Sequence, residues 1–455
     1  MEKNFIFKGK RICRVGFFGL GKSNEALYEY LKRHYEGLSF ILRSDIPIKQ
    51  SQFEVAKFGS DAMTDICEDV LFLSPSVRGD RPEFASAKAA GTLISSDVEF
   101  FFEKSAIPTI SVTGTDGKST TATMASLMLT DTLGPFPATA NIGIPITSVL
   151  DDIDTVGTVA ELSSFQLMNF EPISRRAVIT NVSENHLDWH TSFDEYISAK
   201  ENVLKKARER VFNLDCKICS EFAKKYPAYA VYSMDMSLSE MKNAVDAEHY
   251  FHFSDGALCV CEKKLIDCQD ISFRERYNRQ NFLAAVALCH GLANKRSIER
   301  VAKGFKPLAH RAELVFERDG ISFYDSSVDS TPARTKATVS AFKSPIILIL
   351  GGKGKNLSYT SLFPLSRHVK AIVISGENRA ELQKALFTQK EVIYGKISVF
   401  YAEFFTEAVT TAISLAKSGD SVLLSPASTS FDRFKNYSER GNTFTDIIKK
   451  YYAAK

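Results

Sequence analysis

Short runs of β-branched or aromatic residues alternate with longer helical patterns along almost the whole chain. This alternation is typical of parallel sheets joined by crossover helices, so it predicts an α/β fold. The 455 residues separate into three blocks, 1–97, 98–305 and 306–455, and each contains apolar strand-like segments. At roughly 150 residues per domain, this length also favours about three domains. The connector GFKPLAHR, between the second and third blocks, is predicted to be a hinge.

Charge and composition argue against several classes of function. Lys and Arg total 57 and Asp and Glu total 54, a balance that does not favour nucleic acid or an anionic membrane as the main partner. No apolar run approaches about 18 residues, so no membrane span is expected. The first residues lack the apolar core of a secretory signal, and eight cysteines are too few for a disulfide scaffold. We therefore expect a cytoplasmic protein with reduced thiols and small-molecule substrates.

A glycine turn between an apolar strand and a helix gives the strongest local signal. It comprises Gly114, Thr115, Asp116, Gly117, Lys118, Ser119 and Thr120. A strand, a glycine turn and a helix N-terminus direct several backbone N–H groups at one point, which suits phosphate. Lys118 could reach the β- and γ-phosphates, and the Ser119 hydroxyl could bind Mg²⁺. The complete P-loop pattern would need a glycine at Val112, so this is a shortened variant. The alternative is a glycine turn with a surface lysine.

A second glycine turn, Gly16-Phe-Phe-Gly19-Leu-Gly21, also joins a strand to a helix. It resembles a dinucleotide fingerprint with altered glycine spacing, and Asp45 follows near the position of an acidic ribose ligand. Ser74 ends a later strand and could close over the same nucleotide. Taken alone, such a turn can also be a plain strand–helix connection.

Three further polar residues suggest a metal site near the glycine turn Gly114–Thr120, which we call the phosphate turn. Glu161 and His186 each follow an apolar strand, where open sheets bind ligands. Lys200 lies on the apolar face of the helix predicted over SFDEYISAKENVLKKA, where burial would lower its pKa. The alternatives are structural roles for Glu161 and His186, and a Lys200 side chain that extends to the surface.

The pairs Cys216–Cys219 and Cys259–Cys261 could suggest zinc. Their spacings are unequal and no Cys or His pair completes either site locally, so free thiols are preferred. In the third block, three strand ends are rich in Gly, Ser and Lys and could together bind a small anion. They begin at Asp325, Gly351 and Ser425.

Taken together, these motifs resemble those of a known family. The segments GTDGKST, AELSSFQL, NVSENHLDWH, HRAEL, GGKGK and SPASTSFDRFKNYSERG, with Asn141-Ile142-Gly143 and the lysine of EYISAK, occur in the order and at the distances typical of Mur ligases. GTDGKST and NHLDWH are shared with folylpolyglutamate synthases. The short first block and the SPASTSFDRFKNYSERG tail most resemble the D-glutamate-adding branch.

The resemblance implies a three-domain fold and a reaction. A Rossmann-like N-terminal domain, a P-loop-type central ATPase domain with a mostly parallel sheet, and a Rossmann-like C-terminal domain are expected. ATP would phosphorylate the carboxylate of UDP-N-acetylmuramoyl-L-alanine, and the amine of D-glutamate would then displace phosphate, in peptidoglycan precursor synthesis. Two Mg²⁺ sites, open also to Mn²⁺, and a monomer are expected.

The resemblance also implies roles for individual residues. Catalysis would involve Lys118, Glu161, His186 and a carbamylated Lys200. Metal ligands would be Ser119, Glu161, His186 and Lys200. ATP would contact Gly114 to Thr120, with Asn278, Asn281, His310, Arg311 and Asp325. The uridine diphosphate substrate would contact Gly19, Leu20, Lys22, Ser23, Asp45, Ser74, Asn141 and His186. D-Glutamate would contact Lys355, Ser430, Phe431 and Tyr437.

One segment departs from the family pattern. After Asp325-Ser326, the usual Lys-Ala-Thr-Asn is replaced by Ser327-Val328-Asp329-Ser330, which puts local D-glutamate contacts and amino-acid specificity in question. Three alternatives stay open. A folylpolyglutamate-type or another Mur-type ligase would share the phosphate turn. A Rossmann-type oxidoreductase would bind NAD(P)H at the first turn. A non-catalytic nucleotide-sensing module would bind ATP without releasing phosphate.

Overall fold

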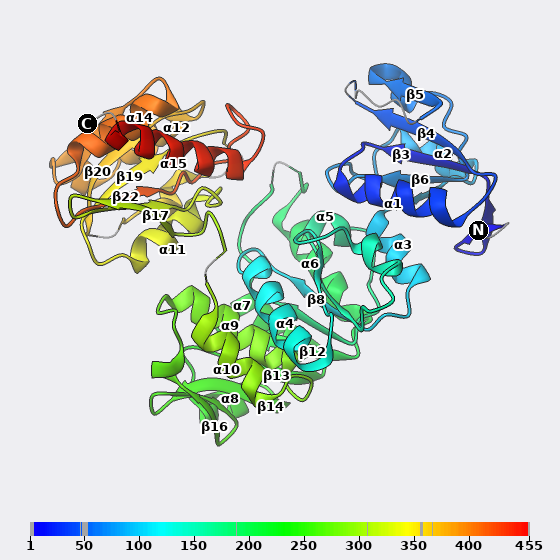
Figure 1. The fold of residues 1–455 in the computed structure, drawn as a ribbon, viewed down its shortest axis with the longest axis horizontal. Helices are drawn as coiled ribbons and strands as arrows, with labels where there is room; N and C mark the ends of the chain where they lie inside the picture. Colours follow the sequence, from blue (N-terminus) through cyan, green and yellow to red (C-terminus); the bar gives the residue numbers. More distant parts are fainter. Residues whose placement is uncertain are drawn as a thin grey trace. The chain divides into compact units, whose positions relative to one another are not determined.

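The computed structural model describes residues 4–45, 47, 53–187, 189–306, 308–354, 358–365 and 367–453. Three large sheets organise these residues, and they can be followed by colour in Figure 1. The chain forms two compact units. The first comprises residues 1–182, 194–274 and 278–305, and the second comprises 183–193, 275–277 and 306–455. The fold is α/β, as the alternation of strand and helix patterns predicts.

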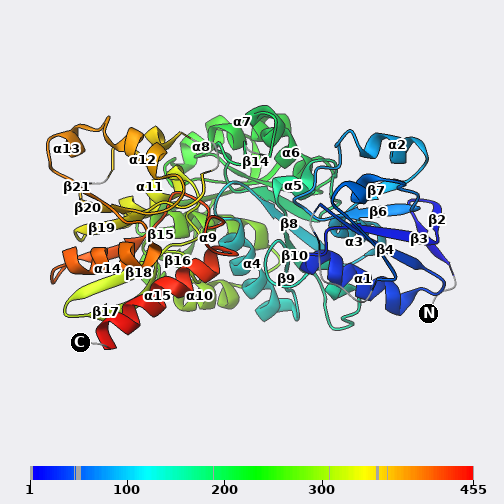
Figure 2. The same ribbon diagram turned by 90° about the horizontal axis from the view of Figure 1, so that it is seen from above.

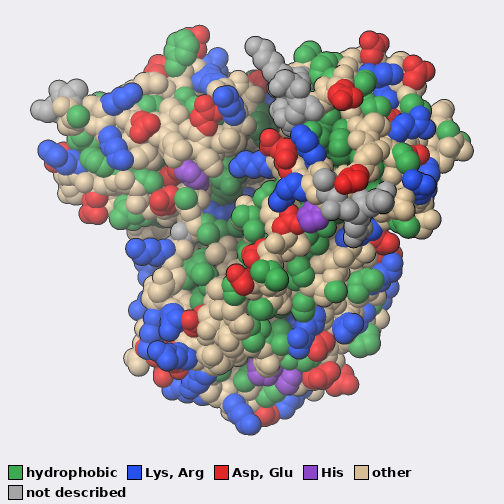
Figure 3. Space-filling view, turned by 45° about the vertical axis from the view of Figure 1, so that its right-hand side comes forward, with side chains coloured by type: hydrophobic (Ala, Val, Ile, Leu, Met, Phe, Trp, Pro, Cys, Tyr) green, Lys and Arg blue, Asp and Glu red, His purple; other side chains and the backbone are tan. Residues whose placement is uncertain are grey.

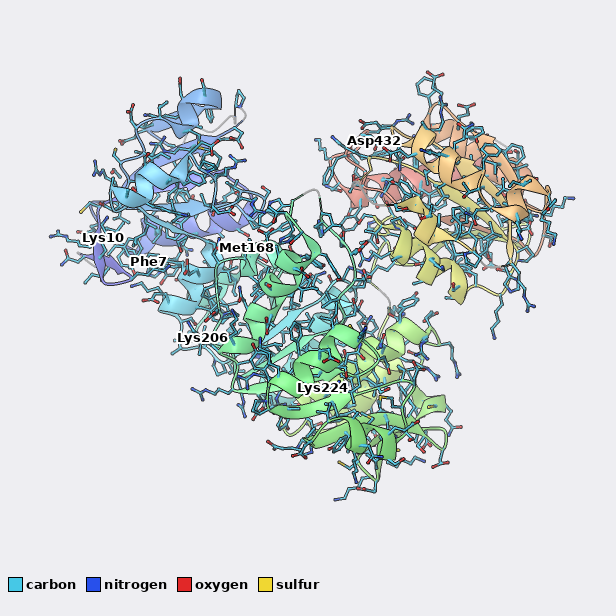
Figure 4. All side chains as sticks on the ribbon, turned by 180° about the vertical axis from the view of Figure 1, so that it is seen from behind. Phe7, Lys10, Met168, Lys206, Lys224 and Asp432 are labelled. Carbon is cyan, nitrogen blue, oxygen red and sulfur yellow. The ribbon has the colours of Figure 1, made fainter. Side chains whose placement is uncertain are left out.

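The first sheet is wholly parallel, in the order β5-β4-β3-β6-β7. Its strands are β3 (Arg14–Phe18), β4 (Ser39–Ser44), β5 (Val55–Phe58), β6 (Val70–Leu73) and β7 (Leu93–Ser95). The helices here are α1 (Lys22–His34), α2 (Phe84–Ala89) and α3 (Asp97–Lys104). A hairpin of β1 (Phe5–Phe7) and β2 (Lys10–Ile12) adds Phe7, labelled in Figure 4, to an aromatic core with Phe17, Phe72 and Phe100.

The central sheet has the order β16-β15-β14-β13-β12-β11-β8-β10-β9, and it is parallel from β9 to β14. Its strands are β8 (Thr109–Thr113), β9 (Ala138–Ala140), β10 (Thr158–Glu161), β11 (Arg176–Ile179), β12 (Glu209–Asn213), β13 (Ala228–Tyr232), β14 (Ala247–Ser254), β15 (Ala257–Val260) and β16 (Lys263–Asp267). Its helices are α4 (Lys118–Leu133), α5 (Ser164–Leu167), α6 (Phe193–Lys205), α7 (Lys217–Lys225), α8 (Leu238–Ala244), α9 (Arg276–Cys289) and α10 (Lys295–Gly304). After β8 the chain passes to β9, at one edge of the sheet, and then to β10, which pairs with β8. It next enters β11, which pairs with β8 on the opposite side from β10. β8 therefore ends at a switch point, where open sheets bind ligands.

The third sheet has the order β17-β18-β22-β19-β20-β21, with only β17 antiparallel. Its strands are β17 (Glu313–Arg318), β18 (Ile321–Asp325), β19 (Ile346–Leu350), β20 (Val369–Ile374), β21 (Ser398–Tyr401) and β22 (Ser421–Leu424). Its helices are α11 (Pro332–Ala341), α12 (Arg379–Leu386), α13 (Lys390–Ile393), α14 (Phe405–Leu415) and α15 (Tyr437–Ala453).

Alternate residues of β19 point into two different cores. Ile347 and Ile349 pack with α14 and α15, whereas Ile346 and Leu348 pack with α11 and α12. Figure 2 shows these helix pairs on opposite faces of the sheet. A strand buried on both faces reads as a continuous apolar run, which explains the sequence IILIL.

Basic and acidic side chains lie interspersed over the face seen in Figure 3, in keeping with a net charge of +3. Among the described residues, no helix is both long enough and apolar enough to cross a membrane.

Candidate functional site

The phosphate turn follows β8 and opens α4, as predicted. Gly114 and Gly117 both have positive φ, +151° and +79°. A Cβ on Gly114 would lie 1.9 Å from Thr180 Oγ1, and one on Gly117 would lie 2.1 Å from Asn281 Oδ1. Because L side chains rarely adopt such φ angles and real Cβ contacts are never so short, both positions require glycine. The second approach also places Asn281, a predicted ATP residue, against the turn.

Two residues that the sequence analysis did not single out hold this turn in place. Asn181 Oδ1 accepts a hydrogen bond from the Asp116 N–H at 2.9 Å, and Asn181 Nδ2 donates to the Asp116 carbonyl at 3.0 Å. Thr180 Oγ1 donates to the same carbonyl at 2.5 Å, and the Thr115 N–H donates to the Asn181 carbonyl. Both residues follow β11, the strand next to β8. The sequence signals for them were their position after the strand-like run RAVI and, for Asn181, its place as the first residue of NVSENHLDWH.

Two lysines donate to carbonyls of the turn. Lys118 Nζ donates to the Thr115 carbonyl at 2.8 Å, and Lys200 Nζ donates to the Gly114 carbonyl at 2.7 Å. Lys200 is 1% exposed, so its side chain is buried and does not extend to the surface. Burial, followed by the nearby charge of Lys118, holds the pKa of Lys200 well below its ordinary value. Its Nζ lies 4.5 Å from the centre of the Tyr196 ring.

Glu161 ends β10, the strand on the other side of β8. Its side chain is 1% exposed, and Oε1 accepts a hydrogen bond from Asn141 Nδ2 at 3.0 Å. Its other oxygen, Oε2, is buried and has no hydrogen-bond partner among the described residues. A buried carboxylate oxygen without a partner is costly, so this arrangement suits a cation. Ser119 lies half-buried in the first turn of α4.

His186 lies in the segment 183–193, which groups with the second compact unit. Its φ is +56°, and the loop is held by the His190 N–H, which donates to the His186 carbonyl at 2.9 Å. Its approach to Glu161 and Lys200 stays a prediction. Asn278, on the same helix as Asn281, is buried.

The six predicted uridine residues other than Asn141 and His186 line one pocket of about 780 Å³. They are Gly19, Leu20, Lys22, Ser23, Asp45 and Ser74. Phe165, which follows β10, closes the same pocket. Gly19 has φ +78°, and a Cβ there would lie 2.7 Å from Ser74 Oγ, so this turn also requires glycine. Asp45 pairs with Arg81 at 3.2 Å.

A polar cluster in the second unit joins three predicted residues. His310 Nδ1 and Asp325 Oδ2 are hydrogen-bonded at 2.6 Å, which raises the pKa of His310. A Cβ on Gly441 would lie 2.2 Å from Asp325 Oδ2, so a glycine of α15 permits this packing. The Tyr437 ring lies 6.0 Å from the His310 ring. Arg311, the remaining ATP candidate there, is half-buried.

Of the D-glutamate candidates, Ser430 is buried, Phe431 and Tyr437 are exposed, and Lys355 lies outside the described residues. Arg440, which the sequence analysis missed, organises the rim. Its buried guanidinium donates to the carbonyls of Ser428 and Thr429, and to Ser327 Oγ at 2.9 Å. Burial lowers the pKa of Arg440 to about 10.

The segment Ser327–Ser330, which departs from the family pattern, is largely internal. Ser327 contacts Arg440, and Asp329 Oδ2 accepts hydrogen bonds from Thr338 Oγ1 and Ser425 Oγ at 2.8 and 2.7 Å. Asp329 is 5% exposed, and burial raises its pKa. These side chains therefore have structural partners in this chain.

The glycine turn at the end of β8 lies in an α/β chain, and the neighbouring strand carries a buried carboxylate. This is the type of site at which α/β enzymes bind phosphate groups. Residues 112–289 match the Mur ligase middle domain, and residues 310–428 match the Mur ligase glutamate ligase domain. The chain belongs to the Mur ligase family.

Individual relatives are similar over nearly their whole length. The chain is 37% identical to the UDP-N-acetylmuramoylalanine--D-glutamate ligase of Acetivibrio thermocellus, with 96% of each chain covered. It is 34% identical to the enzyme of the same name from Ruminiclostridium cellulolyticum, again with 96% of each covered. The crystal structure of the UDP-N-acetylmuramate-alanine ligase of Thermotoga maritima has a TM-score of 0.61 at 17% identity. That match covers 97% of this chain and all of the other, and it shows the shared fold.

Proposed function

We propose that this chain is an ATP-dependent ligase that joins D-glutamate to UDP-N-acetylmuramoyl-L-alanine in peptidoglycan precursor synthesis. The similarity to enzymes of that name over 96% of each chain carries the proposal. The phosphate turn and the single pocket formed by six uridine candidates support it.

The phosphate turn would hold the triphosphate of ATP. Its backbone N–H groups and the N-terminus of α4 favour negative charge there. Lys118 would turn from the Thr115 carbonyl to the transferred phosphate, where its charge counters the charge that builds up in the transition state. We propose that Asn278, Asn281, His310, Arg311 and Asp325 contact the nucleotide.

Glu161 supports a Mg²⁺ site in this turn, because Asn141 orients one of its oxygens and leaves the other buried without a partner. Ser119 would supply a hydroxyl, and His186 would supply a further ligand. Bound Mg²⁺ would neutralise phosphate charge. Mg²⁺ prefers oxygen ligands, so Glu161 and Ser119 fit it.

Lys200 is proposed to react with CO₂. Its low pKa leaves part of the amine neutral, and the neutral nitrogen adds to the carbon of CO₂ and releases a proton. The resulting carbamate is an anion with two oxygens, a ligand type suited to Mg²⁺. An ammonium group at the same place would repel the metal.

The reaction then follows in two steps. A carboxylate oxygen of the alanine attacks the γ-phosphorus of ATP, and ADP leaves. The amine of D-glutamate attacks the acyl carbon, and phosphate leaves. D-Glutamate would contact Lys355, Ser430, Phe431 and Tyr437. The family's usual lysine and threonine are replaced at Ser327–Ser330, so a panel of amino acids is the direct test of specificity.

The test is phosphate release from ATP with UDP-N-acetylmuramoyl-L-alanine and a panel of amino acids. We expect release with D-glutamate and none with L-glutamate, L-lysine or meso-diaminopimelate. Reactions that lack the nucleotide substrate serve as the control. Stronger release with another amino acid would move the chain to another branch of the family. ATP binding without release would favour a nucleotide-sensing module, and NAD(P)H binding would favour an oxidoreductase.

A further inference from the structure

Two cysteines meet at the first turn of α7, the helix whose last turn contains Lys224, labelled in Figure 4. Cys216 is the residue immediately before the helix, and Cys219 is the third residue within it. Cys216 has extended backbone angles and precedes the helix, so the pair has the Cys-X-X-Cys arrangement at a helix N-terminus in which two cysteines can form a disulfide. The two thiols are close enough for Cys219 to lower the pKa of Cys216. The pair is therefore placed to form a disulfide within the chain.

The two thiols have different environments, which suit different roles. Cys216 is half-exposed, and its sulfur accepts a hydrogen bond from the Val182 N–H at 3.4 Å. The adjacent Cys219 thiol lowers the pKa of Cys216 to about 6. Cys219 is fully buried, and its Sγ lies 3.5 Å from the Ile179 carbonyl. The adjacent Cys216 and burial raise the pKa of Cys219. Cys216 thus has the character of an attacking thiolate and Cys219 that of a protonated resolving thiol.

A metal site is a poorer interpretation of this pair. Within the described part of the chain, the only group of three or more His, Cys, Asp or Glu residues with ligand atoms close together is His310, Glu313 and Asp325. Structural zinc takes four ligands, and this pair offers two.

Both sulfurs contact the segment that holds the phosphate turn. Cys219 donates to Ile179, the last residue of β11, and Cys216 accepts from Val182. Between them lie Thr180 and Asn181, whose hydrogen bonds fix Thr115 and Asp116. Forming a disulfide moves both sulfurs and removes the thiol donor and the thiolate acceptor. The support of the phosphate turn would change with them.

We propose that Cys216 and Cys219 are a redox-active dithiol whose closure to a disulfide weakens nucleotide binding at the phosphate turn. The oxidant is a low-molecular-weight disulfide. The Cys216 thiolate attacks one of its sulfurs and releases the other as a thiolate, leaving a mixed disulfide on the protein. Cys219 loses its proton and attacks the Cys216 sulfur, which releases the second thiolate. The small disulfide is reduced by two electrons, and the protein dithiol is oxidised by two.

The first experiment treats the intact protein with oxidised glutathione and maps thiols by alkylation and mass spectrometry. We expect Cys216 and Cys219 to be joined in the wild type and to be alkylated again after dithiothreitol. In Cys219→Ser, a glutathione mixed disulfide should accumulate on Cys216, because nothing resolves it. Cys216→Ser should leave Cys219 unmodified. The pair Cys259 and Cys261, replaced together by serine, is the control and should leave the result unchanged.

This chemical result needs no substrate and is independent of the proposed ligase activity. Persistence of free thiols at Cys216 and Cys219 in folded wild type, while the exposed Cys13 and Cys67 become glutathionylated, would overturn the dithiol. So would a mixed disulfide on Cys216 that survives in the wild type.

The second experiment measures Mg²⁺–ADP binding to reduced and oxidised protein by calorimetry, and this part rests on the proposed nucleotide site. Loss of one or two supporting hydrogen bonds should weaken binding by roughly 5- to 50-fold. Cys216→Ser should bind equally well with and without oxidant. A disulfide that forms without changing the affinity would overturn the link to the phosphate turn. Absence of binding in the reduced protein would instead count against the nucleotide site itself.

Discussion

Lys118 is the residue whose loss should most directly affect phosphoryl transfer. We expect Lys118→Ala to fold normally, because the side chain is half-buried and its ammonium donates to the Thr115 carbonyl within the same turn. Turnover should fall by roughly 10³-fold or more, because a cation that stabilises transition-state charge is removed. Phosphate release and far-ultraviolet circular dichroism measure the two effects. Near-normal turnover by a folded variant would refute the role of the phosphate turn.

Lys200→Ala tests the carbamate. We expect most activity to be lost and part of it to return with formate or acetate, because a short carboxylate can fill the vacated oxygen site. In the wild type, burial lowers the pKa of Lys200, and carbamate formation should therefore depend on pH. Carbamate formation needs the neutral amine, so wild-type activity in limiting bicarbonate should rise as pH rises through that lowered pKa. Full activity in the alanine variant, or no rescue by any short acid, would contradict the carbamate.

At the scale of elements, α3 begins with a buried acid. Asp97 is fully buried at the first residue of the helix, and burial raises its pKa to about 6. The folded pKa lies above the unfolded value of about 3.9, so this group's contribution to stability is complete below pH 4 and is lost as pH rises through 6. Asp97→Asn mimics the protonated acid. At pH 7.5 it should be more stable than wild type by up to about 3 kcal/mol, and the difference should vanish near pH 4.

Asp69→Asn is the matched control for this prediction, because it lies in the same domain and its pKa shifts the other way. Partial burial of Asp69 raises its pKa, but the backbone N–H groups of Cys13 and Arg14 donate to Asp69 Oδ2 at 2.8 and 2.9 Å and lower it. The net result is a pKa of Asp69 below its ordinary value. The carboxylate therefore stabilises the fold above pH 4, and its replacement should destabilise at pH 7.5. Urea unfolding at both pH values measures both variants. An Asp97→Asn protein less stable than wild type at pH 7.5 would contradict the prediction.

Elements whose signals are local in the sequence could be predicted. The hydrogen bonds that join them to residues distant in the sequence could not. The glycine turn lies between β8 and α4, as predicted, because the glycine, strand and helix patterns that indicate it are all local in sequence. The helix predicted over residues 192–207 is α6, Phe193–Lys205, because its apolar residues recur at helical spacing. Thr180 and Asn181 reach the turn from about 65 positions away, and no spacing rule indicates that contact. The buried Arg440 was missed for the same reason, since its partners Ser327 and Ser428 lie in other loops.

At the scale of the whole molecule, one ion pair links the first sheet's domain to the helix that carries Lys200. Arg78 donates to both carboxylate oxygens of Glu195, in the first turn of α6, at 2.9 and 3.0 Å. Each side chain is 19% exposed, so solvent screens the pair only in part. Ser76 and Val77, just before Arg78, line the pocket proposed to bind the uridine nucleotide, and Phe165 lines it from the central domain. The pair therefore helps to fix the two walls of that pocket relative to each other.

Arg78→Ala should loosen this pocket without altering the phosphate turn. We expect the KM for the uridine nucleotide to rise roughly 3- to 10-fold while kcat changes less, since a partly buried bidentate pair contributes about 1–2 kcal/mol. Glu195→Ala should have a similar effect, and the double variant should be little worse than either single one, because both remove the same interaction. Asp80→Ala is the control, because it removes an acidic partner of Arg78 that lies outside α6 and leaves the pair with Glu195 intact. Additive effects of Arg78→Ala and Glu195→Ala on KM, measured by phosphate release, would show that the pair does not couple the two domains.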